Sequence, residues 1–329
     1  MTDEPLDIDC PFPGAVNPHV SFAREHLASW VRNLGLVRET PALRRFDRAD
    51  FAWFAAVVHP SADARRCALV AQWFAWLFLI DDQLDDGVFG TDLTAGRKMR
   101  QEMSAVLRGA EPDSPALVAL ADLWTRTSAG TSAAWRARFA GHLDECLRQA
   151  TEWEAANRVR QVVPDERTYI RNRRHTGAIY VCMDLIEIVE GVELAPEVVA
   201  SADFAAALDA ACNVVCWTND FYSLEKERAH GEVHNLVYLV EHHRRWPSSA
   251  ARQHVRAETA AETARYVRHE RELLHRRPAH AAVLTRVTAG MRSWITGNNL
   301  WSRRTHRYTA EALRSPENYL EATLLGNGS

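Results

Sequence analysis

The chain has 329 residues, of which 47% are hydrophobic, so it is long enough to bury a sizeable core in one large domain or two. Its net charge of −4, without a long basic run, gives nucleic-acid binding no electrostatic support. The amino terminus lacks a basic region followed by an apolar run, and the longest apolar stretches are too short and too interrupted to span a bilayer. The sequence therefore predicts a soluble, cytoplasmic protein with no membrane span and no nucleic-acid partner.

Helical periodicity dominates the chain. Residues 1–17 carry several prolines and glycines and predict an irregular arm. Ser61 is expected to cap the long helix that carries an acidic cluster and ends near Gly87. Strand-like alternation and internal repeats are both missing from the sequence, which predicts one all-α domain of about a dozen helices. The predicted helices cover 19–36, 41–60, 61–86, 93–108, 115–127, 131–160, 165–190, 196–229, 234–244, 248–275 and 278–300.

The first chemical feature is an aromatic and aliphatic run, residues 72–80, that ends in four carboxylates: Asp81, Asp82, Asp85 and Asp86. On a helix, at about 100° per residue, Asp81 and Asp85 lie within roughly 40° of each other. Like charges one turn apart repel, unless a cation sits between them. Oxygen ligands without Cys or His suit Mg²⁺, which prefers a few carboxylates together with substrate phosphates. The alternative is a helix end with solvated acids.

A second polar cluster occupies residues 219–227. Asn219, Ser223 and Glu227 are spaced four residues apart, so a helix places them within roughly 80° on one face. An amide oxygen, a hydroxyl and a carboxylate form a hard-metal site, and Lys226 falls beside the same face, where it can meet a phosphate. Both clusters end apolar helical runs, which suits two walls of one cavity. The alternative is an ordinary exposed helix face.

Together the two clusters, DDQLDD at 81–86 and NDFYSLEKE at 219–227, resemble the metal-binding motifs of bacterial class I terpene synthases. The segment 169–178 resembles the family's pyrophosphate-sensor region, and its Arg173 precedes Asn219 by the 46 residues usual in the family. Arg307-Tyr308 resembles the family's Arg-Tyr pair. The resemblance implies a class I terpenoid synthase α-bundle around a central apolar cavity. The α domain would cover 18–308, with 309–329 a tail that can belong to an active-site lid.

For the metal, the resemblance implies three Mg²⁺ ions. Asp81 would bridge two of them, while Asp82 more often meets the sensor arginine in relatives. Asp85 and Asp86 are weaker ligands, because the later acids of this motif often do not touch metal. The third ion would be held by Asn219, Ser223 and Glu227.

For the substrate, the resemblance assigns Arg173, Lys226, Arg307 and Tyr308 to the diphosphate, which the planar guanidinium forks suit. Gly177 matches the effector position, where a helix break turns a backbone carbonyl toward the substrate. Thr176 matches the linker before it. Glycine would permit the break at low steric cost.

An aromatic pocket would stabilise the carbocation, because ring faces attract cations. The candidates are Phe78, Trp294 and Trp301, with Phe54, Phe74 and Tyr180 as weaker ones; core packing is the alternative for each. No final base can be chosen from the sequence.

The resemblance implies a terpene cyclase that ionises farnesyl diphosphate and gives a sesquiterpene hydrocarbon or alcohol. Geranylgeranyl diphosphate, in a diterpene synthase, is the runner-up, and geranyl diphosphate is third. A chain-elongating prenyl transferase or a squalene-type enzyme would normally carry a second Asp-rich motif. An α-helical interaction protein with acidic patches is the non-enzymatic alternative. Dimerisation is common in the family, so a homodimer is among the expected assemblies.

Overall fold

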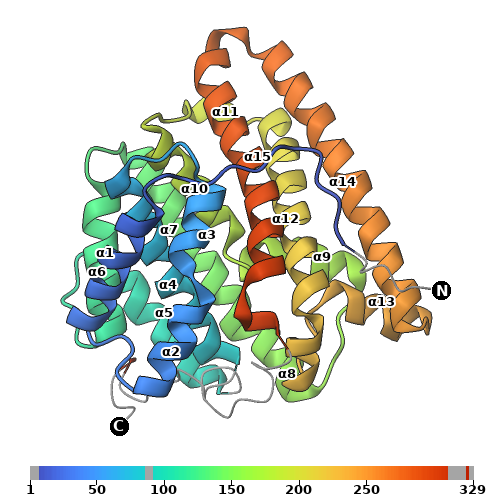
Figure 1. Ribbon diagram of the computed structural model, residues 1–329, viewed down its shortest axis with the longest axis horizontal. Helices are drawn as coiled ribbons and strands as arrows, with labels where there is room; N and C mark the ends of the chain where they lie inside the picture. Colours follow the sequence, from blue (N-terminus) through green and yellow to red (C-terminus); the bar gives the residue numbers. More distant parts are fainter. Residues whose placement is uncertain (1–6, 86–91, 310–323, 326–329) are drawn as a thin grey trace. The chain divides into compact units, whose positions relative to one another are not determined.

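The computed structural model describes residues 7–85, 92–309 and 324–325, and these residues form helices and connecting segments with no strand (Figure 1). The all-α fold class is therefore confirmed. The chain divides into two compact units, which are described separately. Unit 1 comprises Met1–Val16, Val57–Pro60 and Val163–Arg304, and unit 2 comprises Asn17–Ala56, Ser61–Val162 and Thr305–Ser329.

Unit 2 contains the helices of the first half of the chain. Several begin at a readable cap, since the side chains of Asp92, Ser114 and Ser132 each accept a backbone N–H from the first helical turn. The elements are α1 (Val20–Asn33), α2 (Thr40–Ala49), α3 (Phe51–Val58, which ends in unit 1), α4 (Ala64–Asp85), α5 (Leu93–Leu107), α6 (Pro115–Ser128), α7 (Ala133–Arg148), the π-helical η2 (Gln149–Glu154), α8 (Ala155–Arg160) and the 3₁₀ turn η4 (His306–Tyr308).

The helix α4 is the core of unit 2. It is apolar on nearly every side, as a helix buried all round should be, and it packs against α1 and α6. Two buried tryptophans fix it to α6. Trp73 donates its indole N–H to Thr127 Oγ1 (2.8 Å), and Trp76 donates to the carbonyl of Ala116 (2.9 Å). The acidic cluster therefore stands at the end of a firmly held helix.

Unit 1 is built around the long helix α12, which packs against α9, α10, α13, α14 and α15; α12 and α14 run side by side (Figure 1). Its amino terminus is capped by Ser201, whose side chain accepts the N–H of Phe204. The elements are α9 (Glu166–Thr176), α10 (Ile179–Glu190), α11 (Pro196–Val199), α12 (Ala202–Ala229), α13 (Leu236–Arg244), α14 (Ser248–Arg276), the 3₁₀ turn η3 (Pro278–His280) and α15 (Ala281–Arg304).

Four predicted helices are interrupted in the structure. The helix predicted over 41–60 breaks at Asp50, which has a left-handed φ of 50°, and that over 131–160 contains the π turn η2. The helix over 165–190 breaks at Ala178, with φ of 54°, and that over 196–229 breaks after Val199. The predicted cap at Ser61 is also wrong, because α4 begins at Ala64 and Asp63 accepts the N–H of Arg66 instead.

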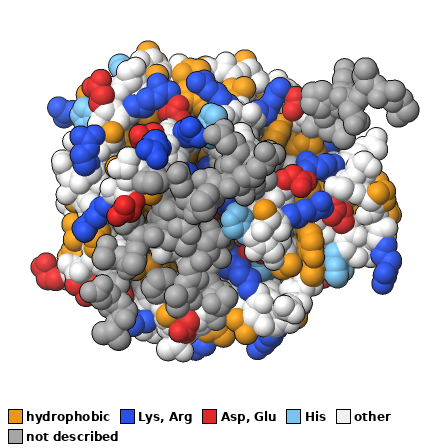
Figure 2. Space-filling view, turned by 60° about the horizontal axis from the view of Figure 1, so that its bottom comes forward, with side chains coloured by type: hydrophobic (Ala, Val, Ile, Leu, Met, Phe, Trp, Pro, Cys, Tyr) orange, Lys and Arg blue, Asp and Glu red, His pale blue; other side chains and the backbone are white. Residues whose placement is uncertain are grey.

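The helix α4 is also the one described helix whose length and composition would allow it to cross a membrane, over Ala64–Leu84. However, 83% of that window is buried inside the structure, as expected for the core helix of a globular protein. Figure 2 shows lysine and arginine side chains mixed with aspartate and glutamate over the face in view. That mixture agrees with the small net charge of the chain.

Candidate active site

The second polar cluster lies in unit 1, within the unbroken helix α12. Asn219, Ser223 and Glu227 therefore stand on successive turns, and the register predicted for them is confirmed. Ser223 is buried, while Asn219 and Glu227 are half-buried. Lys226, the fourth member of the predicted set, is also buried, at 8% exposure. The helix thus brings an amide, a hydroxyl and a carboxylate to one face.

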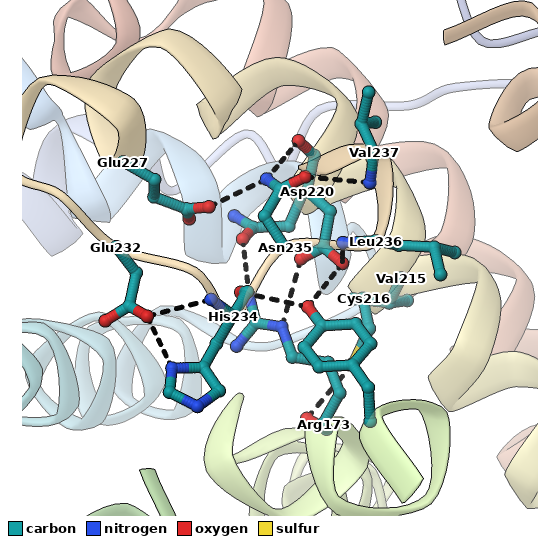
Figure 3. Close-up of polar contacts among 12 residues, drawn as sticks. Arg173, Val215, Cys216, Asp220, Glu227, Glu232, His234, Asn235, Leu236 and Val237 are labelled. Atoms are coloured by element: carbon teal, nitrogen blue, oxygen red, sulfur yellow. Dashed lines mark hydrogen bonds and ion pairs between the residues drawn. The ribbon is translucent and has the colours of Figure 1, made fainter. Parts of the chain in front are cut away.

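Arg173, at the end of α9, is bound to the beginning of this cluster (Figure 3). Its Nε donates to Asp220 Oδ1 (3.0 Å), and its Nη2 donates to Asn219 Oδ1 (2.8 Å). Tyr169, one turn earlier on α9, donates its hydroxyl to Asp220 Oδ2 (2.6 Å). Asp220 has no exposed surface. Burial acts most strongly, to lower the pKa of the Arg173 guanidinium, but Asp220 and the weaker contributions of its neighbours together outweigh burial and hold that pKa well above its usual range.

Glu227 is held from the other side by Asn235, whose Nδ2 donates to Glu227 Oε2 (2.7 Å; Figure 3). Burial raises the pKa of the Glu227 carboxyl to about 7, and the negative charge of Asp220 adds to this shift. Arg173 acts in the opposite direction. A nearby cation would stabilise the ionised form of this carboxyl, which burial and the neighbouring carboxylate destabilise. The electrostatics of this face therefore favour a bound metal.

The donor set fits a hard divalent cation. Ser223 Oγ is buried beside Glu227, close enough to act to lower the pKa of that carboxyl. Within the described ranges there is no group of three His, Cys, Asp or Glu residues suited to a metal. A site on α12 therefore needs the amide and hydroxyl oxygens as well as Glu227.

Gly177 lies at the break between α9 and α10, which the helical pattern over 165–190 missed and the resemblance implied, but the backbone reason differs. Its φ is −73°, and the left-handed residue is Ala178. A Cβ at Gly177 would lie 3.1 Å from the Arg173 carbonyl and 3.3 Å from Arg173 Nη1. Glycine is therefore explained by its close approach to the sensor arginine rather than by backbone freedom. Thr176, the last residue of α9, is buried next to this break.

The first acidic cluster lies in unit 2, at the end of α4. Asp82 is 3% exposed and accepts two hydrogen bonds from Arg307, from Nη1 to Oδ2 (3.1 Å) and from Nη2 to Oδ1 (2.9 Å). The guanidinium of Arg307 also lies over the ring of Phe78, 4.7 Å from its centroid. Asp82 is thus paired with the arginine of the Arg-Tyr pair, which the sequence alone did not predict.

The remaining predicted residues near the end of α4 belong to the first acidic cluster and to the Arg-Tyr pair. Asp81 is half-buried at the end of α4, and Tyr308 is half-buried in η4, beside Arg307. Asp85 is the last residue of α4. Asp86 and most of the predicted tail, 310–323 and 326–329, lie outside the described residues.

The predicted pocket aromatics differ in their surroundings. Phe78 is half-buried and stacks on Phe51 (4.8 Å between centroids), while Phe74 is buried against Phe54 (4.8 Å). These contacts form one aromatic cluster between α3 and α4.

In unit 1, Trp294 and Trp301 are both 1% exposed on α15, and Trp294 donates its indole N–H to His59 Nε2 (3.2 Å). Tyr180 is half-buried and donates its hydroxyl to Asp209 Oδ1 (2.6 Å). Its polar end is therefore occupied by a carboxylate.

Sequence reasoning missed three residues that organise the second cluster: Tyr169, Asp220 and Asn235. Two signals for them were present. Tyr169 and Arg173 are four residues apart, so a helix presents both to the same partner. Asn235 directly precedes an apolar helical run, which is the position of an N-cap. Nothing in the spacing of Asp220 distinguishes it from its neighbours.

Comparison with known proteins gives a consistent result. Residues 72–265, more than half of the chain, match the family model described as terpene synthase family 2, C-terminal metal binding. The chain is 34% identical over 303 residues to a (+)-T-muurolol synthase from Roseiflexus castenholzii, named as cyclising (2E,6E)-farnesyl diphosphate. That alignment covers 91% of this chain and 92% of the relative.

Two further proteins are similar to the chain. A (−)-delta-cadinene synthase from Streptomyces clavuligerus is 35% identical over 255 residues, covering 74% of this chain and 78% of the relative. The solved structure of a cucumene synthase variant superimposes with a TM-score of 0.82 and 29% identity, over 92% of this chain and 100% of that one.

Proposed function

Since this chain belongs to the terpene synthase family, we propose that it ionises farnesyl diphosphate and cyclises the carbocation to a sesquiterpene hydrocarbon or alcohol, with release of pyrophosphate. As a terpene synthase it is a lyase that acts on an isoprenyl diphosphate. The observation that carries the proposal is the set of Asn219, Ser223 and Glu227 on one face of α12, joined to Arg173. The choice of farnesyl diphosphate is supported by the relative named for that substrate.

We propose Mg²⁺ as the metal, with three ions. Asn219, Ser223 and Glu227 would hold one of them, and Asp81, with Asp82 and Asp85, the others. Bound there, Mg²⁺ would neutralise charge on the departing diphosphate. The support is the oxygen-only donor set, the buried Ser223 hydroxyl beside Glu227 and the metal-binding description of the family.

The arginines of the chain would bind and orient the diphosphate. Arg173 and Arg307 are each anchored to a carboxylate, Asp220 and Asp82 respectively, which fixes the direction of the guanidinium before substrate binds. Such preorganised donors stabilise developing charge without reorganising. Lys226 and Tyr308 would add donors, and the carbonyl at Gly177 would face the reacting end of the substrate.

The aromatic residues would shield the carbocation from water. Phe78 supports this role, because its ring face already lies under the Arg307 guanidinium and so presents itself to a positive group. Trp294, Trp301, Phe74 and Tyr180 complete the proposed lining.

The test is incubation of the purified protein with geranyl, farnesyl and geranylgeranyl diphosphates, with and without Mg²⁺, followed by gas chromatography and mass spectrometry. A cyclic C15 product that requires Mg²⁺ is expected. A C20 product as the main outcome would replace the substrate in the proposal. A longer prenyl diphosphate formed with added isopentenyl diphosphate would indicate a prenyl transferase, an alternative that the comparisons do not favour.

We also propose a cytoplasmic location and a homodimer. The first is supported by the burial of α4, the one apolar helix among the described residues that is long enough to cross a membrane. The homodimer rests on the family alone. Size-exclusion chromatography with light scattering tests it, and a monomer mass would reject it.

A further inference from the structure

The loop that joins α12 to α13 ends at Asn235, a residue with no exposed surface. Its Nδ2 donates to the Asp220 carbonyl (2.7 Å) and to Glu227 Oε2 (2.7 Å). Its Oδ1 accepts the N–H groups of Val237 (2.9 Å) and Tyr238 (3.3 Å), which caps α13. The side chain therefore uses both amide hydrogens and its oxygen. Its oxygen caps α13, and its amide hydrogens bind two residues of α12.

We propose that Asn235 is a positioning residue that holds the Glu227 carboxylate in the orientation that binds metal. The inference rests on the proposed function, which makes Glu227 a ligand. The hydrogen bond from Asn235 engages Oε2, so the other carboxylate oxygen of Glu227, Oε1, lies outside this bond and can face a cation. Partners that orient a ligand in this way are typically worth 10–100-fold in metal affinity.

The chemical type of the donor matters. A lysine or arginine in this place would neutralise Glu227 and compete with a divalent cation for it. The amide of Asn235 instead orders the carboxylate while leaving its charge available. It also removes rotamer freedom from a glutamate side chain, and that ordering would otherwise have to accompany metal binding.

The surrounding loop is built to deliver this amide. Glu232 accepts the backbone N–H groups of Val233 (2.7 Å) and His234 (2.8 Å), and it also pairs with the His234 ring (Figure 3). The Tyr169 hydroxyl, which donates mainly to Asp220 Oδ2 (2.6 Å), also lies 3.1 Å from the carbonyl oxygen of His234 and shares its proton with it. The loop is thereby fixed on both sides immediately before Asn235.

The same loop reaches the sensor arginine. Leu236, the residue after Asn235, donates its N–H to Asp220 Oδ2 (3.0 Å), the carboxylate that binds Arg173 through its other oxygen. Asn235 therefore positions Glu227, the proposed metal ligand. Leu236, next to it, positions Asp220, which in turn holds Arg173, the proposed diphosphate ligand. This arrangement separates the role of Asn235 from that of an ordinary helix cap.

The experiment compares the full-length protein with N235D. Aspartate caps a helix as well as asparagine does, so α13 keeps its cap. The variant loses the donor to Glu227 and gains a like charge beside it. The readout is the melting temperature in a titration of Mg²⁺ with fixed inorganic pyrophosphate. We expect the Mg²⁺ concentration that gives half of the maximal shift to rise on the order of 10- to 100-fold.

The matched control is D165N, which exchanges the same two residue types at the exposed cap of α9, where Asp165 accepts the N–H of Thr168 (2.9 Å). This control should keep the wild-type Mg²⁺ dependence. If N235D does not fold, N235S, which keeps a capping oxygen but is too short to reach Glu227, replaces it.

An unchanged Mg²⁺ dependence in the folded variant, alongside a normal wild-type shift, would overturn the role of Asn235 alone. No Mg²⁺-dependent shift in the wild-type protein would overturn the metal site of the proposed function, and the role of Asn235 with it.

Discussion

His59 makes the stability of the protein depend on pH in a calculable way. The residue lies directly after α3, is 2% exposed, and accepts a hydrogen bond from the indole N–H of Trp294 through Nε2 (3.2 Å). Burial lowers the pKa of the His59 imidazole to about 3, because the charged form would lose its hydration. The neutral ring is therefore the form that the folded protein accepts.

The direction in which stability changes with pH follows from the linkage between proton binding and folding. The folded pKa lies below the unfolded value of about 6.5, so the unfolded state binds the proton first as the pH falls. The stabilisation is fully present above about pH 6.5 and is lost progressively between there and about pH 3. Between pH 7 and pH 5, this single group should lower the free energy of unfolding by about 2 kcal/mol.

The assay is urea unfolding of the wild-type protein and of H59Q at a series of pH values from 7 to 5. Glutamine retains an acceptor for Trp294 but does not titrate. The wild type should lose about 2 kcal/mol more than H59Q over this interval, whatever the offset between the two at pH 7. Parallel pH dependences for the two proteins would refute the reasoning, because all other titrating groups are common to both.

Two further perturbations follow from the packing. G297A should destabilise the protein by about 1–3 kcal/mol, because its Cβ would lie 2.5 Å from the carbonyl oxygen of Val57, whereas G141A, with open space at that point of α7, should be neutral or stabilising by up to about 1 kcal/mol; equal melting temperatures for the two variants would contradict this. R307A should cost about 3–5 kcal/mol by leaving Asp82 buried without its partner, and the double variant R307A/D82A should recover part of that loss in the same thermal measurement; an additive double variant would show that the ion pair contributes no coupling.

The sequence was sufficient for the helical fold because the apolar period of 3.6 residues is a local property of each segment. Two of the helix breaks that the periodicity missed occur where a non-glycine residue adopts a left-handed conformation. Asp50 ends α2 in this way, whereas Ala178 precedes the first residue of α10, and alanine carries no turn signal at all. The π turn at 149–154 has no signature of its own in the pattern, since its residues continue the helical composition on both sides.

The contrast between local periodicity and long-range packing also explains which residues of the site could be placed from the sequence. The spacing of Asn219, Ser223 and Glu227 is a property of one helix, so the sequence placed them on one face correctly. The hydrogen bonds that Asp220 accepts from Tyr169 and Arg173 depend on how α9 packs against α12. That packing joins residues about fifty positions apart and leaves no periodic trace in the sequence.

The position of Arg173 has a consequence for ligand binding. Its Nη2 occupies Asn219 Oδ1, the oxygen proposed to bind Mg²⁺, while its Nε holds Asp220. An amide oxygen has two lone pairs, but a guanidinium and a divalent cation on the same oxygen would repel each other strongly in a partly buried site. If Asn219 binds metal as proposed, Arg173 releases Asn219 and keeps Asp220, which frees one side of its fork for a phosphate oxygen. Metal and diphosphate would then favour each other's binding, and by linkage this coupling is equal in both directions. The anchoring of Arg173 by two partners, only one of them a proposed metal ligand, is thus what allows the residue to change its ligand without losing its position.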